Sequence, residues 1–349
     1  MKKNNSSLGW LKWVGFVMAL LLGGGLYFVY GILPAKIGGA LVERSKIHKP
    51  LTESPKDYNI KDFENVSFPS GGVTLSGWWI PVRGSHPLGT VLLSHGVFKN
   101  REQVLSRAVF LHRLGYQTLL FDHRGHGLSG NSPLSGGLLE AQDYPAGAGY
   151  LEGRHLLKKP VVYLGFSLGA ISALRAAAQS PGVDGVMADS PLANIKSYVS
   201  RRSMGGAFSS MPGFLHCVLE DYDRLSGLTL KEEDLDLMPV VQKLGETPVL
   251  YITGENDDLA KPDEVRKLFE KTSSHHRRLV YIPDAGHEET YKKFPVIYEK
   301  VVRDFLADLR NGFPQPDDEN GVPGGKEKKK FSKWKHHPVK QETPEALAP

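Results

Sequence analysis

The pentapeptide Gly165-Phe166-Ser167-Leu168-Gly169 places a serine hydroxyl between two glycines. It follows Pro160–Leu164, an apolar β-rich run that predicts a buried strand, and precedes Ala170–Ala178, whose alanines favour a helix. A chain that turns this sharply from strand to helix needs neighbours without bulk, which the two glycines supply. Ser167 is therefore predicted to present its Oγ at a helix N-terminus, where developing negative charge is stabilised. A chance match is the alternative, since glycine and serine are common residues.

A nucleophilic serine also needs a base that takes its proton and a carboxylate that orients the base. His287 follows Arg278–Ile282, a run that predicts a strand. A second predicted strand, Pro248–Thr253, is followed by three carboxylates: Glu255, Asp257 and Asp258. Because parallel strands end at one edge of a sheet, where ligands bind, we expect His287 and a carboxylate from this group to lie together there.

The negative charge that forms on an attacked carbonyl oxygen needs hydrogen-bond donors. Thr90–Ser94 is predicted as a strand that leads into His95, Gly96 and Val97. In a strand–turn–helix arrangement, one backbone N–H comes from the loop after that strand and the other from the residue after the nucleophile. We assign these roles to Val97 and Leu168. His95 precedes the serine in the chain and is interpreted as a brace for the loop rather than as the base.

Four motifs carry a resemblance to a known family. They are Ser94-His95-Gly96, Asp122–Ser129, Gly165–Gly169 and Asp284–His287. The chain resembles the α/β-hydrolase superfamily, in the branch of serine aminopeptidase-like and monoacylglycerol-lipase-like hydrolases, over about residues 64–311. The resemblance implies an α/β-hydrolase fold: a mostly parallel eight-stranded sheet with helices on both faces and a small cap insert. It implies no metal and no organic cofactor.

The resemblance also implies a catalytic triad: Ser167, Asp257 and His287. The family spacing after Gly254 favours Asp257 over Glu255 and Asp258. Asp189 also follows a predicted strand and is the second candidate, although Asp189-Ser190-Pro191 equally predicts a turn or a helix start.

The motif Asp122–Ser129 is expected to be a structural turn pinned by Asp122 and Arg124. His123 and His126 in the same motif could suggest a metal pair. No third ligand follows at a suitable spacing, so we favour the structural interpretation.

The N-terminal region contains Trp13–Ala35, 23 positions without a charged residue. A helix of this length spans roughly 34 Å, enough to cross a bilayer core. A cleaved signal peptide has an apolar region of only about 7–15 residues, so we favour an uncleaved, single-pass transmembrane anchor. Lysines and arginines flank both ends almost equally. We expect the lysine-bearing N-terminus inside and the hydrolase on the non-cytoplasmic side. Gly15, Ala19 and Gly23 are spaced for transmembrane helix pairing, although such glycines are common.

The expected organisation is a membrane anchor at 1–35, a linker at 36–63, the hydrolase domain at 64–311 with its cap at about 191–245, and a disordered basic tail at 312–349. Helices are predicted at Lys261–Lys271 and at Thr290–Leu309. The net charge of the 349-residue chain is +5, and lysines cluster in the tail between Lys326 and Lys340; we expect no nucleic-acid partner. Basic and aromatic residues at Lys326–Lys335 could contact anionic lipid, or the tail is merely solvated.

These observations predict a membrane-anchored serine hydrolase that cleaves an ester, thioester or amide of a small-molecule acyl substrate through an acyl-enzyme. Peptidase or acyltransferase activity is the alternative within the same fold. A catalytically silent binding module tethered to the membrane is the alternative from another class. The intact serine, aspartate and histidine disfavour the silent module.

Overall fold

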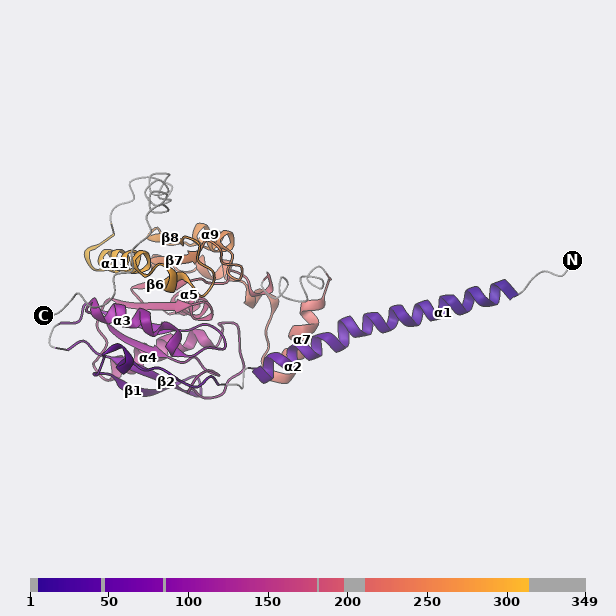
Figure 1. The fold of residues 1–349 in the computed structure, drawn as a ribbon, viewed down its shortest axis with the longest axis horizontal. Helices are drawn as coiled ribbons and strands as arrows, with labels where there is room; N and C mark the ends of the chain where they lie inside the picture. Colours follow the sequence, from indigo (N-terminus) through magenta and orange to yellow (C-terminus); the bar gives the residue numbers. More distant parts are fainter. Residues whose placement is uncertain (1–5, 45–47, 84–85, 181, 198–210, 314–349) are drawn as a thin grey trace. The chain divides into compact units, whose positions relative to one another are not determined.

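The computed structural model describes residues 6–44, 48–83, 86–180, 182–197 and 211–313. Its centre is an eight-stranded sheet in the order β1-β2-β4-β3-β5-β6-β7-β8 (Figure 1). The strands are β1 (Glu64–Ser70), β2 (Val73–Ile80), β3 (Thr90–Ser94), β4 (Gln117–Phe121), β5 (Val161–Phe166), β6 (Gly185–Asp189), β7 (Val249–Gly254) and β8 (Arg277–Ile282). β2 pairs antiparallel with β1 and β4, and the other pairs are parallel. The mostly parallel eight-stranded sheet predicted from the sequence is confirmed.

Burial explains why the strands differ in composition. β3, β4, β5, β6 and β7 are buried at every position, because helices cover both faces of the parallel part. β1 lies at the sheet edge, and its residues alternate between exposed and buried from Asn65 onward. This alternation is what an antiparallel edge strand with one solvated face requires.

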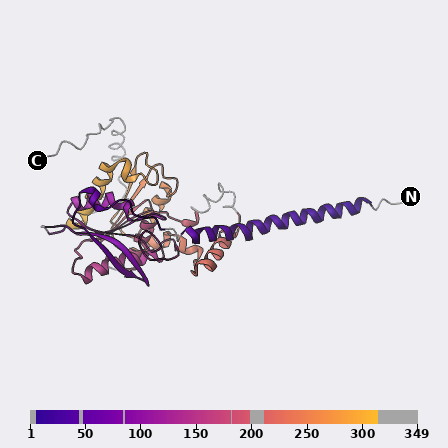
Figure 2. The same cartoon turned by 60° about the horizontal axis from the view of Figure 1, so that its bottom comes forward.

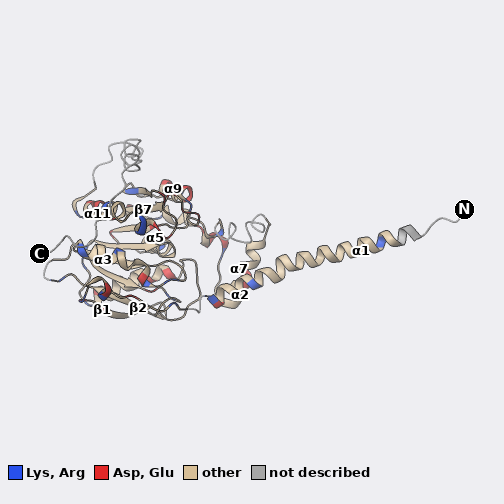
Figure 3. Ribbon diagram, in the orientation of Figure 1, with Lys and Arg blue, Asp and Glu red and all other residues tan. Residues whose placement is uncertain are grey.

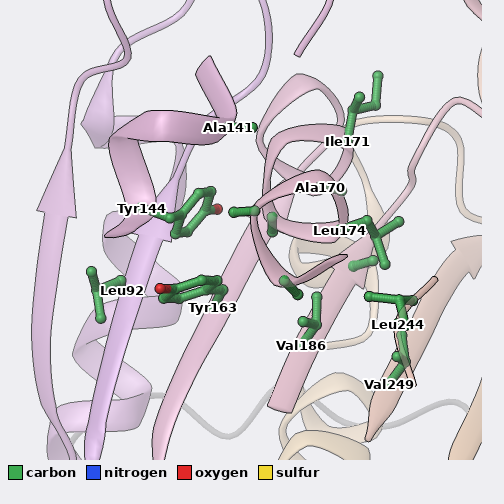
Figure 4. Packing of buried hydrophobic residues seen from close by; sticks show 14 of the residues in the cluster. Leu92, Ala141, Tyr144, Tyr163, Ala170, Ile171, Leu174, Val186, Leu244 and Val249 are labelled. Carbon is green, nitrogen blue, oxygen red and sulfur yellow. The ribbon is translucent and has the colours of Figure 1, made fainter. Parts of the chain in front are cut away.

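Two hydrophobic layers hold the helices on the sheet. One contains Leu92, Tyr163 and Val186, which pack against α4 (Asp143–Gly153), α5 (Leu168–Gln179) and α9 (Pro262–Lys271). Figure 4 shows part of this layer around Tyr144, Ala170 and Leu174. The opposite layer contains the alternate strand residues, such as Leu93 and Leu164, with α3 (Leu105–Arg113) and α11 (Pro295–Asn311). Successive residues of one strand therefore serve opposite faces.

The last predicted helix is wrong in one respect. Residues Thr290–Leu309 were expected to form one helix, whereas α10 (Thr290–Lys293) and α11 are separated at Phe294. Phe294 has φ −137° and ψ 64°, outside the helical region. Pro295 explains the break, since proline disfavours helical geometry at the residue before it and has no N–H to continue the helix.

The N-terminal segment is helical from Ser6 to Arg44, as α1 (Ser6–Tyr27), a π-turn η1 (Phe28–Ile32) and α2 (Leu33–Arg44). Pro34 accounts for the π-turn: its ring excludes the carbonyl four residues earlier, and the widened turn bonds Leu33 N–H to the Phe28 carbonyl instead. Within the described residues, one helix, Trp10–Arg44, is long and apolar enough to cross a membrane. Figure 3 shows its long uncharged stretch.

The region expected to be a linker, residues 36–63, is more structured than predicted. α2 packs against the cap helix α7 (Phe214–Ser226), and the two helices lie side by side in Figures 1 and 2. A Cβ at Gly38 would lie 3.0 Å from the Tyr222 backbone nitrogen, so glycine permits this close approach. Farther along, the Arg44 guanidinium lies 4.5 Å from the centroid of the Phe98 ring. Sequence patterns missed this packing because the partners are distant in the chain.

The described part of the cap contains α7, a 3₁₀ turn η6 (Glu232–Leu235) and α8 (Met238–Val241). Tyr222 of α7 donates a hydrogen bond to the Leu134 carbonyl at 2.6 Å, which ties the cap to the body. Short 3₁₀ turns also occur at η2 (Pro55–Tyr58), η3 (Arg101–Val104) and η4 (Glu140–Gln142). Cap residues 198–210 and the predicted basic tail from residue 314 onward lie outside the described residues.

Candidate active site

Ser167 occupies a strained turn between β5 and α5. Its φ of 54° and ψ of −111° are unfavourable for a residue with a side chain. A Cβ at Gly165 would lie 2.0 Å from the Gly169 carbonyl oxygen, and a Cβ at Gly169 would lie 2.6 Å from the Ser94 carbonyl oxygen. Both glycines are therefore required by close backbone contacts, in agreement with the prediction from the sequence.

The structure brings the three predicted catalytic side chains into hydrogen-bond contact. His287 Nε2 lies 2.9 Å from Ser167 Oγ, and His287 Nδ1 lies 2.8 Å from Asp257 Oδ2. A proton on Nδ1 faces the carboxylate, which leaves the lone pair of Nε2 for the serine hydroxyl. The Ser167 residue is 5% exposed and the His287 side chain 10% exposed, so the chain of contacts is largely withdrawn from water.

Of the candidate carboxylates, Asp257 is the one that contacts His287. Its second oxygen, Oδ1, accepts hydrogen bonds from Leu259 N–H at 2.9 Å and Ala260 N–H at 2.8 Å. These two donors fix the carboxylate plane toward the histidine. Glu255 and Asp258 are exposed.

Asp189, the second candidate, faces a different partner. Its Oδ2 accepts from Arg107 Nη2 at 2.6 Å and Nε at 3.1 Å. Its backbone carbonyl accepts the N–H of Ser167 at 2.9 Å. Burial alone would lower the pKa of Arg107, but Tyr298 and Asp189 outweigh burial and the net pKa is raised. Asp189 is therefore held in a buried ion pair.

Val97 and Leu168 lie where the oxyanion donors were predicted, after β3 and directly after Ser167. Neither backbone N–H donates a hydrogen bond to another of the described residues. The loop itself is braced, because Gly96 N–H donates to Gln103 Oε1 at 2.8 Å. Gly169 N–H donates to the His95 carbonyl at 3.0 Å, which ties the loop to the start of α5. Two N–H groups are thus available for a ligand oxygen.

His95 belongs to a buried cluster of three histidines, which also contains His123 and His126. Its Nε2 accepts from His123 N–H at 3.2 Å, and its ring centroid lies 5.3 Å from that of His126. His123 Nδ1 donates to Asp143 Oδ2 at 3.1 Å. Burial holds the pKa of His95 well below its usual range, so its ring stays neutral. In the described part of the chain, no group of three His, Cys, Asp or Glu side chains is arranged to hold a metal ion.

The turn after β4 is pinned by its two charged residues. Asp122 accepts from Arg101 N–H at 2.7 Å and from Leu128 N–H at 2.8 Å. Arg124 Nη2 donates to Asp143 Oδ1 at 2.7 Å. These bonds hold in place the turn that carries two of the three clustered histidines.

Sequence reasoning missed Arg107 and Thr290. Thr290 Oγ1 donates to Asp189 Oδ1 at 2.9 Å and receives a hydrogen bond from Arg107 Nη2 at 3.2 Å. The available signal was a charge on a buried helix face: Val104 and Leu111, three residues before and four after Arg107, are both fully buried. A charge in such a position needs a buried partner.

Comparisons with known proteins concern the fold and the family. Residues 85–224 match the family model of serine aminopeptidase, S33. The Pyrococcus furiosus esterase PF2001 superposes with a TM-score of 0.62 at 27% identity, over 75% of this chain and 96% of the esterase. The uncharacterised protein YqkD of Bacillus subtilis is 28% identical over 64% of this chain and 72% of its own length. The polyketide transferase ATR5 of Stachybotrys chlorohalonatus is 29% identical over 59% of this chain and 84% of its own length. The chain has the α/β-hydrolase fold, and the family match together with the esterase likeness supports the α/β-hydrolase superfamily, in its serine aminopeptidase branch.

Proposed function

We propose that this protein is a membrane-anchored serine hydrolase that cleaves an ester, thioester or amide through an acyl-enzyme. The observation that carries the proposal is the continuous contact from Ser167 through His287 to Asp257, with distances of 2.9 and 2.8 Å. The likeness to an esterase of the same fold supports it. A silent binding module has no need for a serine held in a strained conformation.

In the proposed first step, Ser167 Oγ forms a bond to the substrate carbonyl carbon while His287 Nε2 takes the hydroxyl proton. The carbonyl oxygen becomes an oxyanion, which the N–H groups of Val97 and Leu168 receive. Asp257 stabilises the imidazolium that forms. Collapse of the intermediate breaks the bond to the leaving group, and His287 returns the proton to the departing alcohol, thiol or amine.

In the second step, water attacks the acyl-enzyme while His287 takes its proton. Collapse releases the carboxylic acid and restores the Ser167 hydroxyl. If an alcohol or amine replaces water, the same steps transfer the acyl group. The likeness to a polyketide transferase supports this second candidate, acyl transfer, and the serine aminopeptidase family supports a trial of aminoacyl amides.

The test uses a fluorophosphonate probe together with a panel of p-nitrophenyl esters, thioesters and aminoacyl amides. We expect wild-type protein to be labelled and to turn over part of the panel, and Ser167→Ala to do neither. Ser172→Ala is the matched control, since Ser172 is a buried serine of α5, the helix that follows Ser167, and its hydroxyl bonds the Leu168 carbonyl at 2.8 Å. Equal labelling of folded Ser167→Ala protein would overturn the proposed nucleophile. Product analysis with added alcohols or amines separates hydrolysis from transfer.

We further propose that the helix around Trp13–Ala35 anchors the protein in a membrane, with the catalytic domain on the non-cytoplasmic side. Support comes from the length and apolar character of this helix. Protease added to intact cells should then digest the hydrolase domain. Protection of the domain until the membrane is permeabilised would reverse the orientation.

A further inference from the structure

We propose that Arg107, Asp189 and Thr290 form a buried clamp that positions the catalytic histidine against the nucleophile. The three residues are positioning residues, because their side chains bond to one another and not to Ser167 Oγ or the His287 ring. The inference rests on the proposed function, since it concerns the geometry of the same hydroxyl and imidazole.

Asp189 joins the two halves of the site through its own atoms. Its backbone carbonyl accepts Ser167 N–H at 2.9 Å, on the nucleophile side. Its carboxylate accepts Thr290 Oγ1 at 2.9 and 3.1 Å, on the histidine side. Thr290 follows His287 by only three residues and begins α10. Asp189 therefore holds the histidine loop at a fixed position relative to the turn that carries the nucleophile.

Arg107 makes this junction rigid. Its guanidinium bonds Asp189 at 2.6 Å, Thr290 at 3.2 Å and Tyr298 Oη at 3.1 Å. It also lies 5.3 Å from the ring centroid of Phe166, the residue before the nucleophile. A planar group with fixed donors can serve these partners at once, which a lysine ammonium cannot do in the same geometry.

The ring of Phe166 continues the contact to the base. Its centroid lies 5.2 Å from that of His287, so one aromatic ring separates the guanidinium from the imidazole. On another side, Arg107 Nη1 donates to the Gln103 carbonyl at 3.3 Å, and Gln103 braces Gly96 in the predicted oxyanion loop. Arg107 is therefore linked to the nucleophile turn, the histidine loop and the predicted oxyanion loop.

The clamp is fully buried. Arg107 is 5% exposed, and Asp189 and Thr290 are 0% exposed. A buried ion pair is weak evidence for stability, because desolvation opposes the attraction between the charges. Its value here is geometric: Asp257 sets the rotation of the imidazole ring, whereas the clamp sets the position of the backbone from which the ring projects.

The test removes one hydroxyl and keeps the ion pair. Thr290→Val should lower kcat for p-nitrophenyl acetate by about 100-fold, the cost of displacing a reacting group by roughly 1 Å. KM should stay within about threefold, because substrate contacts are unchanged. Fluorophosphonate labelling should slow in parallel with kcat. Thr290→Ser restores a hydroxyl and should recover both rates.

The matched control is Thr272→Val. Thr272 is 3% exposed, and its hydroxyl bonds the Leu268 carbonyl at 2.8 Å and Tyr251 Oη at 2.7 Å, after α9 and away from the catalytic loops. Thr272→Val should lower the unfolding midpoint with unchanged kcat per folded molecule. If Thr290→Val behaves in the same way, the clamp is only structural and the inference fails. Failure of Thr290→Ser to recover activity would also overturn it.

A readout without substrate separates this inference from the proposed function. His287 Nδ1 lies 2.8 Å from Asp257 Oδ2, and the proton between them should give a low-field NMR resonance in wild-type protein. We expect the resonance in Thr272→Val and Thr290→Ser and its loss or broadening in Thr290→Val. An inactive wild-type protein that shows this pattern would refute the hydrolase and retain the clamp. An unchanged resonance in Thr290→Val would refute the clamp, whatever the activity.

Discussion

Replacement of Asp257 by asparagine should reverse the proton positions on His287, the proposed base. Oδ1 of Asp257 accepts two backbone N–H groups, from Leu259 and Ala260, whereas Oδ2 faces His287. In Asp257→Asn, the amide oxygen should stay with the two N–H donors, because the NH₂ group would clash with them. The NH₂ group must then point at His287 Nδ1.

An amide NH₂ group is a donor, so Nδ1 has to accept and the imidazole proton moves to Nε2. Nε2 then donates toward Ser167 Oγ and can no longer take its proton. The same substitution in a serine protease triad lowers kcat by about 10⁴-fold. That ratio corresponds to about 5.5 kcal/mol of transition-state stabilisation.

The assay compares kcat with p-nitrophenyl acetate for wild-type protein, Asp257→Asn and Asp258→Asn. Asp258 is the exposed neighbour, and its replacement removes the same charge from the same loop. We expect the full loss in Asp257→Asn and little change in Asp258→Asn. A folded Asp257→Asn protein that keeps activity within about tenfold of wild type would refute the orienting role.

Three further outcomes are expected. Gly165→Ala should prevent folding or lower the free energy of unfolding by at least about 2 kcal/mol, because its Cβ would lie 2.0 Å from a backbone oxygen. Gly149→Ala is the control, since its Cβ would enter open space, and thermal unfolding measures both variants. His95 must stay neutral in the folded protein but binds a proton in the unfolded chain below its ordinary pKa of 6.5, so it should lower the free energy of unfolding as the pH falls through that value; His126, whose pKa burial also lowers, should add to the fall. Denaturant titrations at each pH should show that His95→Asn reduces this slope and that His155→Asn, on the surface, does not; a slope as steep in His95→Asn as in the wild type would contradict the assignment. The full-length protein should resist extraction by high salt or alkaline carbonate and need detergent, and a soluble form trimmed near residue 35 would instead indicate removal of Trp13–Ala35 as a signal peptide.

Sequence patterns predicted the elements whose structure depends on residues close together in the chain. Thr90–Ser94 was predicted as a strand with the bounds that the structure has, because a buried parallel strand needs an unbroken apolar run. The turn around Ser167 was predictable because its backbone contacts exclude every side chain at two flanking positions. Asp257 and His287 could be placed at one sheet edge from strand order alone.

Contacts between distant residues were not predictable in this way. Arg107 and Asp189 are 82 positions apart, and Arg107 and Thr290 are 183 apart, so no periodicity relates them. The packing of α2 on α7 was missed for the same reason, since glycine is needed at position 38 only because Tyr222 lies against it. Pro295 was visible in the sequence and should have divided the last helix, since proline is a direct local signal.

The conformation of Ser167 also has a consequence for the evolution of this chain. A side chain held at φ 54° and ψ −111° costs about 1–3 kcal/mol, whereas glycine adopts positive φ freely and gives back only about 0.4–1 kcal/mol through its more flexible unfolded state. Selection for stability alone would therefore favour glycine over serine at this position. A chain that keeps serine there carries a lasting stability deficit, which selection tolerates only while the hydroxyl is in use. The unfolding midpoint of Ser167→Gly, raised above that of the wild type in a protein without turnover, would measure the size of that deficit.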